Sequence, residues 1–347
     1  MIFVLIFIFF LIFKNCRIFS FTNENQFNSE YISREFTQTI NGIFVILVFL
    51  NHFSQYIAEV YVFDKVVLQF LKLLGQCVNC SFLFYSGFGI CEQLKFNKNE
   101  YCKKLIKIRF PKLLIRFMIC VFVYLILSFI FEKNYSIKQI LLAFVGLESI
   151  GNSSWYIFYI LLSYVLVYFS FIIFNNQIFA VISFNVLMIL YTLFMFYFFP
   201  EKNAYYLTTL IFPLGMYFSL FKDKIQIFLK KNYLVCLILS FVLYFISFLF
   251  RHKFNLSGIF YNFTAICFSL ILIVLTFKVQ IKSKILSFLG NNIFYIYILQ
   301  RIPMICCSEI VRGGVQKNSY LLIMIFCFAI TLLLSYLFKT IFEKIHL

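Results

Sequence analysis

Long runs of apolar residues, separated by short charged segments, decide what this chain can fold into. A helix needs about 20 apolar residues to cross the hydrocarbon core of a bilayer. Ten such runs fall at residues 40–60, 66–90, 113–131, 154–174, 178–199, 205–221, 233–250, 258–277, 285–307 and 319–338. Only 12% of the residues are charged, which is about half the share found in soluble domains. We therefore predict an all-α, polytopic membrane protein with about ten transmembrane helices.

The distribution of Lys and Arg predicts how these helices are oriented. Cytoplasmic loops of membrane proteins carry an excess of both residues. If the polar segment before residue 40 is cytoplasmic, the inner segments hold 19 of the 30 Lys and Arg, and the outer segments hold nine. Both termini are then expected in the cytoplasm. The same loops account for the net charge of +17, since basic loops face anionic lipid, so no nucleic-acid partner is expected.

Residues 1–35 differ from the rest of the chain. The apolar run at 2–13 is short for a membrane span, and it lacks the basic start of a signal peptide. It fits an accessory or interfacial segment, or an over-extended start site. We therefore divide the chain into an N-terminal leader, 1–35, and one membrane domain, 36–347, which no linker or low-complexity tract interrupts.

One histidine lies inside the first run. An ionisable side chain within an apolar membrane segment is a functional-site hypothesis by default. His52 is expected about 18 Å along the helix from Ile40, in the outer half of a core about 30 Å thick. Asn51, Ser54 and Gln55 flank it, so this end of the helix carries a polar stripe.

The eleven cysteines are scattered and lie mostly in apolar runs, which is typical of reduced thiols that pack as small apolar residues. Cys77 and Cys80 are separated by two residues, and Cys306 adjoins Cys307. Neither pair has the further cysteines or histidines that would complete a zinc site. We expect no metal site.

A strongly basic segment separates the second run from the third. Two interpretations are open. The cations face anionic lipid, or they bind the phosphates of a cytosolic ligand through charge and directed hydrogen bonds. The segment, expected to be a cytoplasmic loop, contains Lys95, Lys98, Lys103, Lys104, Lys107, Arg109 and Lys112.

Polar residues also interrupt three other runs. Ser86 lies in a glycine-containing stretch at 81–89, Trp155 and Tyr156 open the fourth run, and Gln300 and Arg301 lie in the ninth. Each has an ordinary structural explanation: close helix packing for the first, anchoring at the headgroups for the second, and the bundle interior or the outer interface for the third.

Taken in order, these motifs resemble the acyltransferase-3 family of integral membrane acyltransferases. The resemblance covers residues 36–340 and rests on segments 41–52, 82–89, 107–111, 155–156 and 289–300. It implies ten membrane helices and transfer of an acyl group, commonly acetyl, from cytosolic acyl-CoA to a glycan hydroxyl. Acetyl-CoA would be a co-substrate, with no bound cofactor. The acceptor would be a cell-surface glycan or lipid-linked sugar, reached from the bacterial cytoplasmic membrane and its lipid.

The resemblance also implies roles for single residues. His52 matches the family's essential histidine and would be the general base, since an imidazole with a pKa of about 6.5 is neutral near pH 7. The family's Arg-x-Arg motif appears here as Lys107 and Arg109, with a lysine in the first position. With Lys103 and Lys104 beside them, they would bind the phosphates of acyl-CoA. A covalent acyl-histidine intermediate is an alternative to the base role.

Supporting roles would belong to Asn41, Ser86, Trp155, Tyr156 and Gln300. Two of these positions depart from the family pattern. Asn41 stands where the family has an arginine, and Gln300 stands where many members have a histidine.

Two other functions fit the same sequence. A non-catalytic membrane transporter or glycan-export component would also have many helices, few charges and isolated polar residues, although no inverted repeat is evident. A degenerate family member, kept for the assembly of a complex, would account for the two departures.

Overall fold

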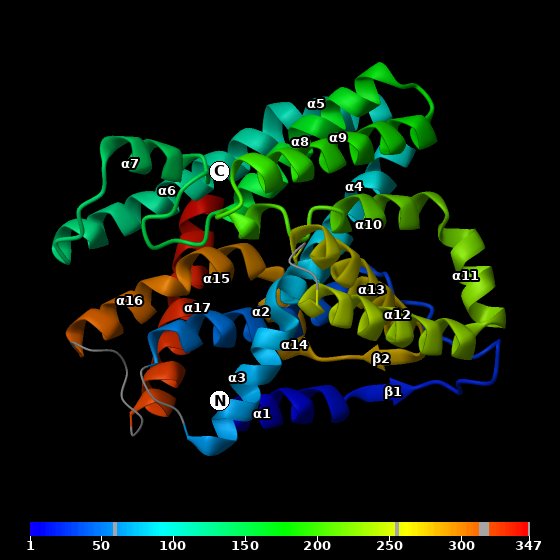
Figure 1. Cartoon of the computed structure of the whole chain (residues 1–347), viewed down its shortest axis with the longest axis horizontal. Helices are drawn as coiled ribbons and strands as arrows, with labels where there is room; N and C mark the ends of the chain where they lie inside the picture. Colours follow the sequence, from blue (N-terminus) through cyan, green and yellow to red (C-terminus); the bar gives the residue numbers. More distant parts are fainter. Residues whose placement is uncertain (58–60, 254–256, 312–318, 346–347) are drawn as a thin grey trace.

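Helices make up almost the whole of the computed structural model, which describes residues 1–57, 61–253, 257–311 and 319–345 (Figure 1). Helix α7 and the end of α16 lie at one end of the long axis, whereas α11 and the strand pair lie towards the other. The sequence assigns these segments to opposite sides of the membrane. The helices are α1 (Ile2–Phe13), α2 (Arg34–Phe53), α3 (Val62–Leu74), α4 (Cys80–Phe96), α5 (Lys98–Lys104), α6 (Phe110–Ile130), α7 (Ile137–Phe144), α8 (Trp155–Ile173), α9 (Gln177–Phe198), α10 (Ile211–Leu220), α11 (Lys222–Lys231), α12 (Tyr233–Lys253), α13 (Ser257–Lys278), α14 (Lys284–Asn291), α15 (Ile293–Leu299), α16 (Arg301–Ile310) and α17 (Tyr320–Lys344).

Nine segments within the described residues are long and apolar enough to cross a bilayer. They are formed by α2, by α3 with α4, by α5 with α6, by α8, α9, α12 and α13, by α15 with α16, and by α17. The prediction of an all-α, multi-pass membrane protein is confirmed.

Two of the ten predicted runs form shorter helices than expected. At 205–221, the Asn262 side chain of α13 accepts the Leu210 amide at 3.1 Å and holds the preceding residues in a turn, so α10 begins only at Ile211. Its ten residues span about 15 Å, half the thickness of a bilayer core. At 285–307, the run divides into α14, α15 and α16. Pro303 contributes to the second interruption, because it has no amide hydrogen to offer the carbonyl of Leu299.

The basic segment between the second and third runs is helical, so its prediction as a loop is wrong. Helix α5 is capped by Asn97, whose side chain accepts the amide of Glu100 at 3.2 Å. A π-helical turn at Leu105–Arg109 then leads directly into α6. Lysine favours helix formation, so a lysine-rich segment suits this conformation. Insertions of π-helix often mark functional positions.

Two helix crossings depend on glycine. A Cβ at Gly42 of α2 would overlap the backbone of Leu286 in α14, and a Cβ at Gly290 of α14 would overlap the backbone of Gln38 in α2. The same reciprocal contact joins Gly87 of α4 to α10. Small residues at membrane-helix crossings allow backbones to approach closely, and these contacts fix α2 and α4 at the centre of the bundle.

The first 35 residues pack against the remainder of the chain. Strand β1 (Cys16–Ile18) pairs in antiparallel fashion with β2 (Val279–Ile281). The Asn28 side chain, fully buried, donates to the carbonyl of Thr276 at 3.1 Å. Helix α1 contributes Ile8 and Leu11 to a hydrophobic cluster that also includes residues of α2 and α17.

The interior contains two large hydrophobic clusters. One gathers around α2, α15 and α17, and the other gathers around α4, α8, α10 and α13. Tyr85 and Tyr156 pack against both clusters. The boundary between the clusters is where the polar side chains described next are found.

Candidate active site

His52 lies in the last turn of α2, at the far end of the first span. Its side chain is half-buried, and its Nδ1 atom is buried without a hydrogen-bond partner among the described residues. Buried polar atoms are usually paired, because leaving one unpaired costs about 1–3 kcal/mol. Among the described residues, no protein group therefore competes with a substrate for this ring nitrogen.

Two tyrosines continue inward from the histidine. The ring of Tyr297, on α15, lies 6.1 Å from the ring of His52, and the ring of Tyr156, on α8, lies 5.2 Å from that of Tyr297. The Tyr297 hydroxyl is also buried and lies near Ser153, but makes no well-formed hydrogen bond among the described residues. The His52–Tyr297–Tyr156 row therefore combines a potential base with a buried hydrogen-bond donor.

Sequence reasoning singled out His52 and Tyr156 but missed Tyr297. Tyr297 belongs to the apolar motif at 289–300 and lies three residues before Gln300, so both face the same side of their helix. That spacing is the signal that was available. It became informative only once α15 was seen to pack beside α2.

A polar cavity of about 430 Å³ adjoins the inner end of this row. The Tyr156 hydroxyl lies within hydrogen-bonding reach of Ser86, and Ser86 lines the cavity. The volume is in the range of small-molecule sites. The cavity is lined by Arg34, Tyr85, Ser86, Gly89, Ile90, Gln93, Tyr101, Arg109 and Tyr164.

Of the four predicted phosphate-binding cations, only Arg109 lines this cavity. Its guanidinium lies over the ring of Tyr101, 5.0 Å from the centroid, in a cation–π contact. Lys103, Lys104 and Lys107 are exposed on the same helical segment but are not part of the cavity wall.

Gln300 and Arg301 occupy the junction between α15 and α16. Gln300 is fully buried, and its Nε2 donates to the carbonyl of Tyr297 at 3.0 Å. Arg301 donates through Nε to Ser153 at 3.1 Å and through Nη2 to Gln55 at 2.8 Å. Its charge is near enough to act electrostatically on His52. Gln300 thus supports Tyr297, whereas Arg301 links Gln55 to Ser153 beside the site.

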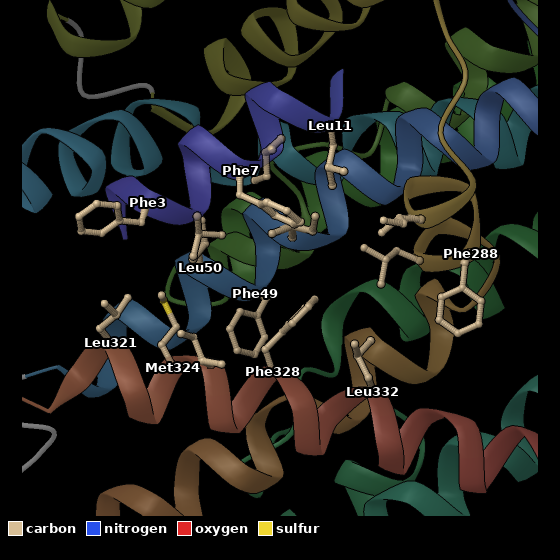
Figure 2. Close-up of a pocket in the computed structure, with 16 residues that line it drawn as sticks. Phe3, Phe7, Leu11, Phe49, Leu50, Phe288, Leu321, Met324, Phe328 and Leu332 are labelled. Atoms are coloured by element: carbon tan, nitrogen blue, oxygen red, sulfur yellow. The ribbon is translucent and has the colours of Figure 1, made fainter. Parts of the chain in front are cut away.

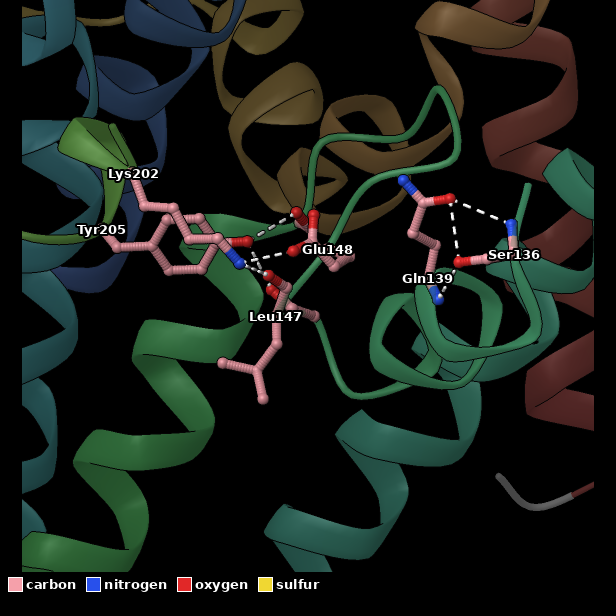
Figure 3. Close-up of polar contacts among 8 residues, drawn as sticks. Ser136, Gln139, Leu147, Glu148, Lys202 and Tyr205 are labelled. Carbon is pink, nitrogen blue, oxygen red and sulfur yellow. Dashed lines mark hydrogen bonds and ion pairs between the residues drawn. The ribbon is translucent and has the colours of Figure 1, made fainter. Parts of the chain in front are cut away.

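The loop that carries Ser153 is held by a second polar network (Figure 3). Lys202 pairs with Glu148 at 2.5 Å and donates to the Leu147 carbonyl at 3.0 Å. The Tyr205 hydroxyl donates to the Gly146 carbonyl at 2.7 Å. Figure 3 also shows the capping box of α7, in which Ser136 and Gln139 bond reciprocally. These contacts fix the segment before α8 and, through it, the partner of Arg301.

Trp155 and Asn41 lie away from the centre of the row. Trp155 packs with Met195 and Tyr205 in a separate small cluster, and its ring meets Tyr156 edge-on at 6.0 Å. Asn41 is half-buried, with a buried, unpartnered Oδ1, but it lies eleven residues, or about 16 Å, from His52 along α2. Neither residue lines the polar cavity.

A second cavity of about 430 Å³ opens between α1, α2, α14 and α17 (Figure 2). All of its lining residues are apolar. It offers no group for proton transfer or for binding an anion, so the site chemistry belongs to the polar cavity and the row beside it. Labelled in Figure 2 are Phe3, Phe7, Leu11, Phe49, Leu50, Phe288, Leu321, Met324, Phe328 and Leu332.

These features define a multi-pass membrane protein with a histidine and two tyrosines in a row, of which Tyr156 packs against both hydrophobic clusters. The model of the acyltransferase-3 family, described as an acyltransferase domain, matches residues 39–340. The chain belongs to this family, whose activity is acyl transfer in the membrane. No curated protein and no solved structure matches it significantly.

Proposed function

We propose that this protein transfers an acyl group, acetyl in particular, from cytosolic acyl-CoA to a hydroxyl of a cell-surface or membrane-linked glycan. The setting is the bacterial cytoplasmic membrane. The observation that carries the proposal is a row of neighbouring side chains that leads from an arginine-lined cavity to His52. The row consists of Ser86, Tyr156 and Tyr297. The donor enters from the cavity end, and the acceptor approaches His52 from the end at which Arg301 lies.

The reaction needs a base for the acceptor hydroxyl and a donor for the oxyanion. His52 takes the proton from the acceptor oxygen, which attacks the thioester carbonyl carbon. The tetrahedral intermediate then collapses: the carbon–sulfur bond breaks, the ester remains on the acceptor, and the CoA sulfur leaves with the proton held by His52. General-base help of this kind contributes about 10²–10⁴-fold.

Tyr297 is our candidate for the oxyanion donor. Its hydroxyl is buried, makes no well-formed hydrogen bond among the described residues and belongs to the ring nearest His52 in the row. A fixed donor in a site that excludes water stabilises developing charge more than the same donor does in water. Arg109, at the cavity wall, supports binding of the donor phosphates.

The test uses the full chain purified into lipid vesicles, with acetyl-labelled acetyl-CoA and glycan extracted from a strain that lacks the gene. We expect label on the glycan with the unaltered protein and at least a 100-fold slower transfer with His52→Gln. Ser54→Ala, which removes a hydroxyl from the same helix end, is the matched control and retains activity. Transfer that persists in His52→Gln would rule out the base role.

A further inference from the structure

Arg34 shares the wall of the polar cavity with Arg109. The sequence placed Arg34 in a polar segment ahead of the first span. In the structure it is the first residue of α2, because the Ser33 side chain caps the helix by accepting the amide of Phe36 at 3.3 Å. Two guanidinium groups, from α2 and from the π-helical turn before α6, therefore meet at one cavity.

Neither guanidinium is neutralised by a carboxylate. Among the described residues, no ion pair involves Arg34 or Arg109, whereas Lys95 pairs with Glu92 at 2.6 Å close by on α4. The nine residues of the cavity wall include no Asp and no Glu. A concave site with two uncompensated arginines attracts anions, and arginine forks suit phosphate oxygens in particular.

Arg34 and His52 lie at opposite ends of α2, on the same side of the helix. Arg34, Asn41 and His52 are separated by seven and eleven residues, which are close to whole numbers of turns at 3.6 residues per turn. The three residues consequently share one side of the helix. Between them this side is filled by the buried Val45 and Val48, so a long ligand with its phosphates at Arg34 would extend towards His52 through the cavity and the row beside it.

We propose that Arg34 is a second phosphate-binding residue of the donor site and makes the protein select CoA thioesters by their phosphates. The inference rests on the proposed function.

The test measures equilibrium binding of three probes to the purified full chain in neutral detergent. Acetyl-CoA carries both thioester and phosphates, adenosine 3′,5′-bisphosphate carries phosphates alone, and S-acetylpantetheine carries the thioester alone. Arg34→Ala should weaken binding of the first two by about 10- to 100-fold, as expected for a lost charge-assisted contact. Binding of S-acetylpantetheine should not change.

Three further variants sharpen the result. Arg34→Lys should recover part of the lost affinity, because it restores the charge without the fork. Glu35→Gln, a charge change at the adjacent exposed position, and Lys224→Ala, the loss of an exposed cation on α11, should bind all three probes normally. Arg34 is exposed, so its replacement should leave the melting temperature unchanged.

The outcomes separate this inference from the function on which it rests. If the unaltered chain does not bind acetyl-CoA, both are wrong. If it binds acetyl-CoA and Arg34→Ala binds it equally well, or loses S-acetylpantetheine to the same degree, only the role of Arg34 is wrong. If Arg34→Ala changes retention of phosphatidylglycerol but not of acetyl-CoA, the side chain faces lipid headgroups, and the proposal is likewise overturned.

Discussion

Removal of one oxygen atom, in Tyr297→Phe, separates catalysis from stability. The Tyr297 hydroxyl is buried and makes no well-formed hydrogen bond among the described residues, whereas its ring packs 6.1 Å from His52 and 5.2 Å from Tyr156. Phenylalanine keeps the ring and both contacts. A purely structural tyrosine would be expected to have a paired hydroxyl.

The substitution should have a large effect on the rate and a small effect on stability. Loss of an oxyanion donor lowers kcat by about 10²–10³-fold. The hydroxyl lies near Ser153 without a well-formed hydrogen bond, so its removal should change the free energy of unfolding by no more than about 1 kcal/mol. We therefore expect a protein of nearly unchanged stability that is much slower.

The assay combines kcat for transfer of labelled acetyl to glycan with thermal unfolding of the same preparation. Tyr295→Phe is the matched control, because Tyr295 is on the same helix and its ring stacks on Phe342 of α17 at 6.0 Å, outside the row. The control should retain kcat. An unchanged kcat in Tyr297→Phe, or a loss of activity that follows a loss of stability, would refute the assignment of Tyr297 as oxyanion donor.

Two further predictions concern the scaffold around the site. Gly87→Ala should prevent α4 from packing on α10, because the new Cβ overlaps the backbone of Phe212, and no monodisperse protein should be obtained. The control is Gly89→Ala, where the added Cβ meets nothing within 4 Å, and this variant should fold with an unchanged melting temperature. Tyr205→Phe removes the hydrogen bond to Gly146, so it should lower the free energy of unfolding by about 1 kcal/mol. It should also reduce kcat, because it loosens the loop that holds Arg301. If thermal unfolding and kcat are both unchanged, this loop does not position the site.

Hydropathy was enough to predict the class of fold and the place of His52. The first run, at 40–60, is long and apolar, so it predicts a membrane helix that carries His52 towards its outer end, and in the structure His52 lies in the last turn of α2. The ends of elements depended on local polar contacts. Ser33 starts α2 earlier than the apolar pattern suggests, and Asn262 delays the start of α10 through a bond from another helix.

The remainder of the candidate site required tertiary structure. Tyr297 is one of 23 tyrosines, and its position in an apolar motif carries no sign that α15 lies against α2. The sequence predicted phosphate binding for four cations of the basic segment, yet among these four only Arg109, in the π-helical turn, lines the cavity. Arg34 was overlooked for the same reason: its partner in the cavity is 75 residues away in the sequence.

The most direct measurement is transfer of labelled acetyl from acetyl-CoA to glycan by the purified protein in vesicles, with the original chain and His52→Gln compared at equal amounts of folded protein. We expect label on the glycan with the original chain only, and an undiminished affinity for acetyl-CoA in the variant. Equal transfer by both proteins would contradict the role of His52. Absence of transfer by the original chain, with an acceptor glycan known to lack its acetyl groups, would contradict acetyl transfer from CoA itself.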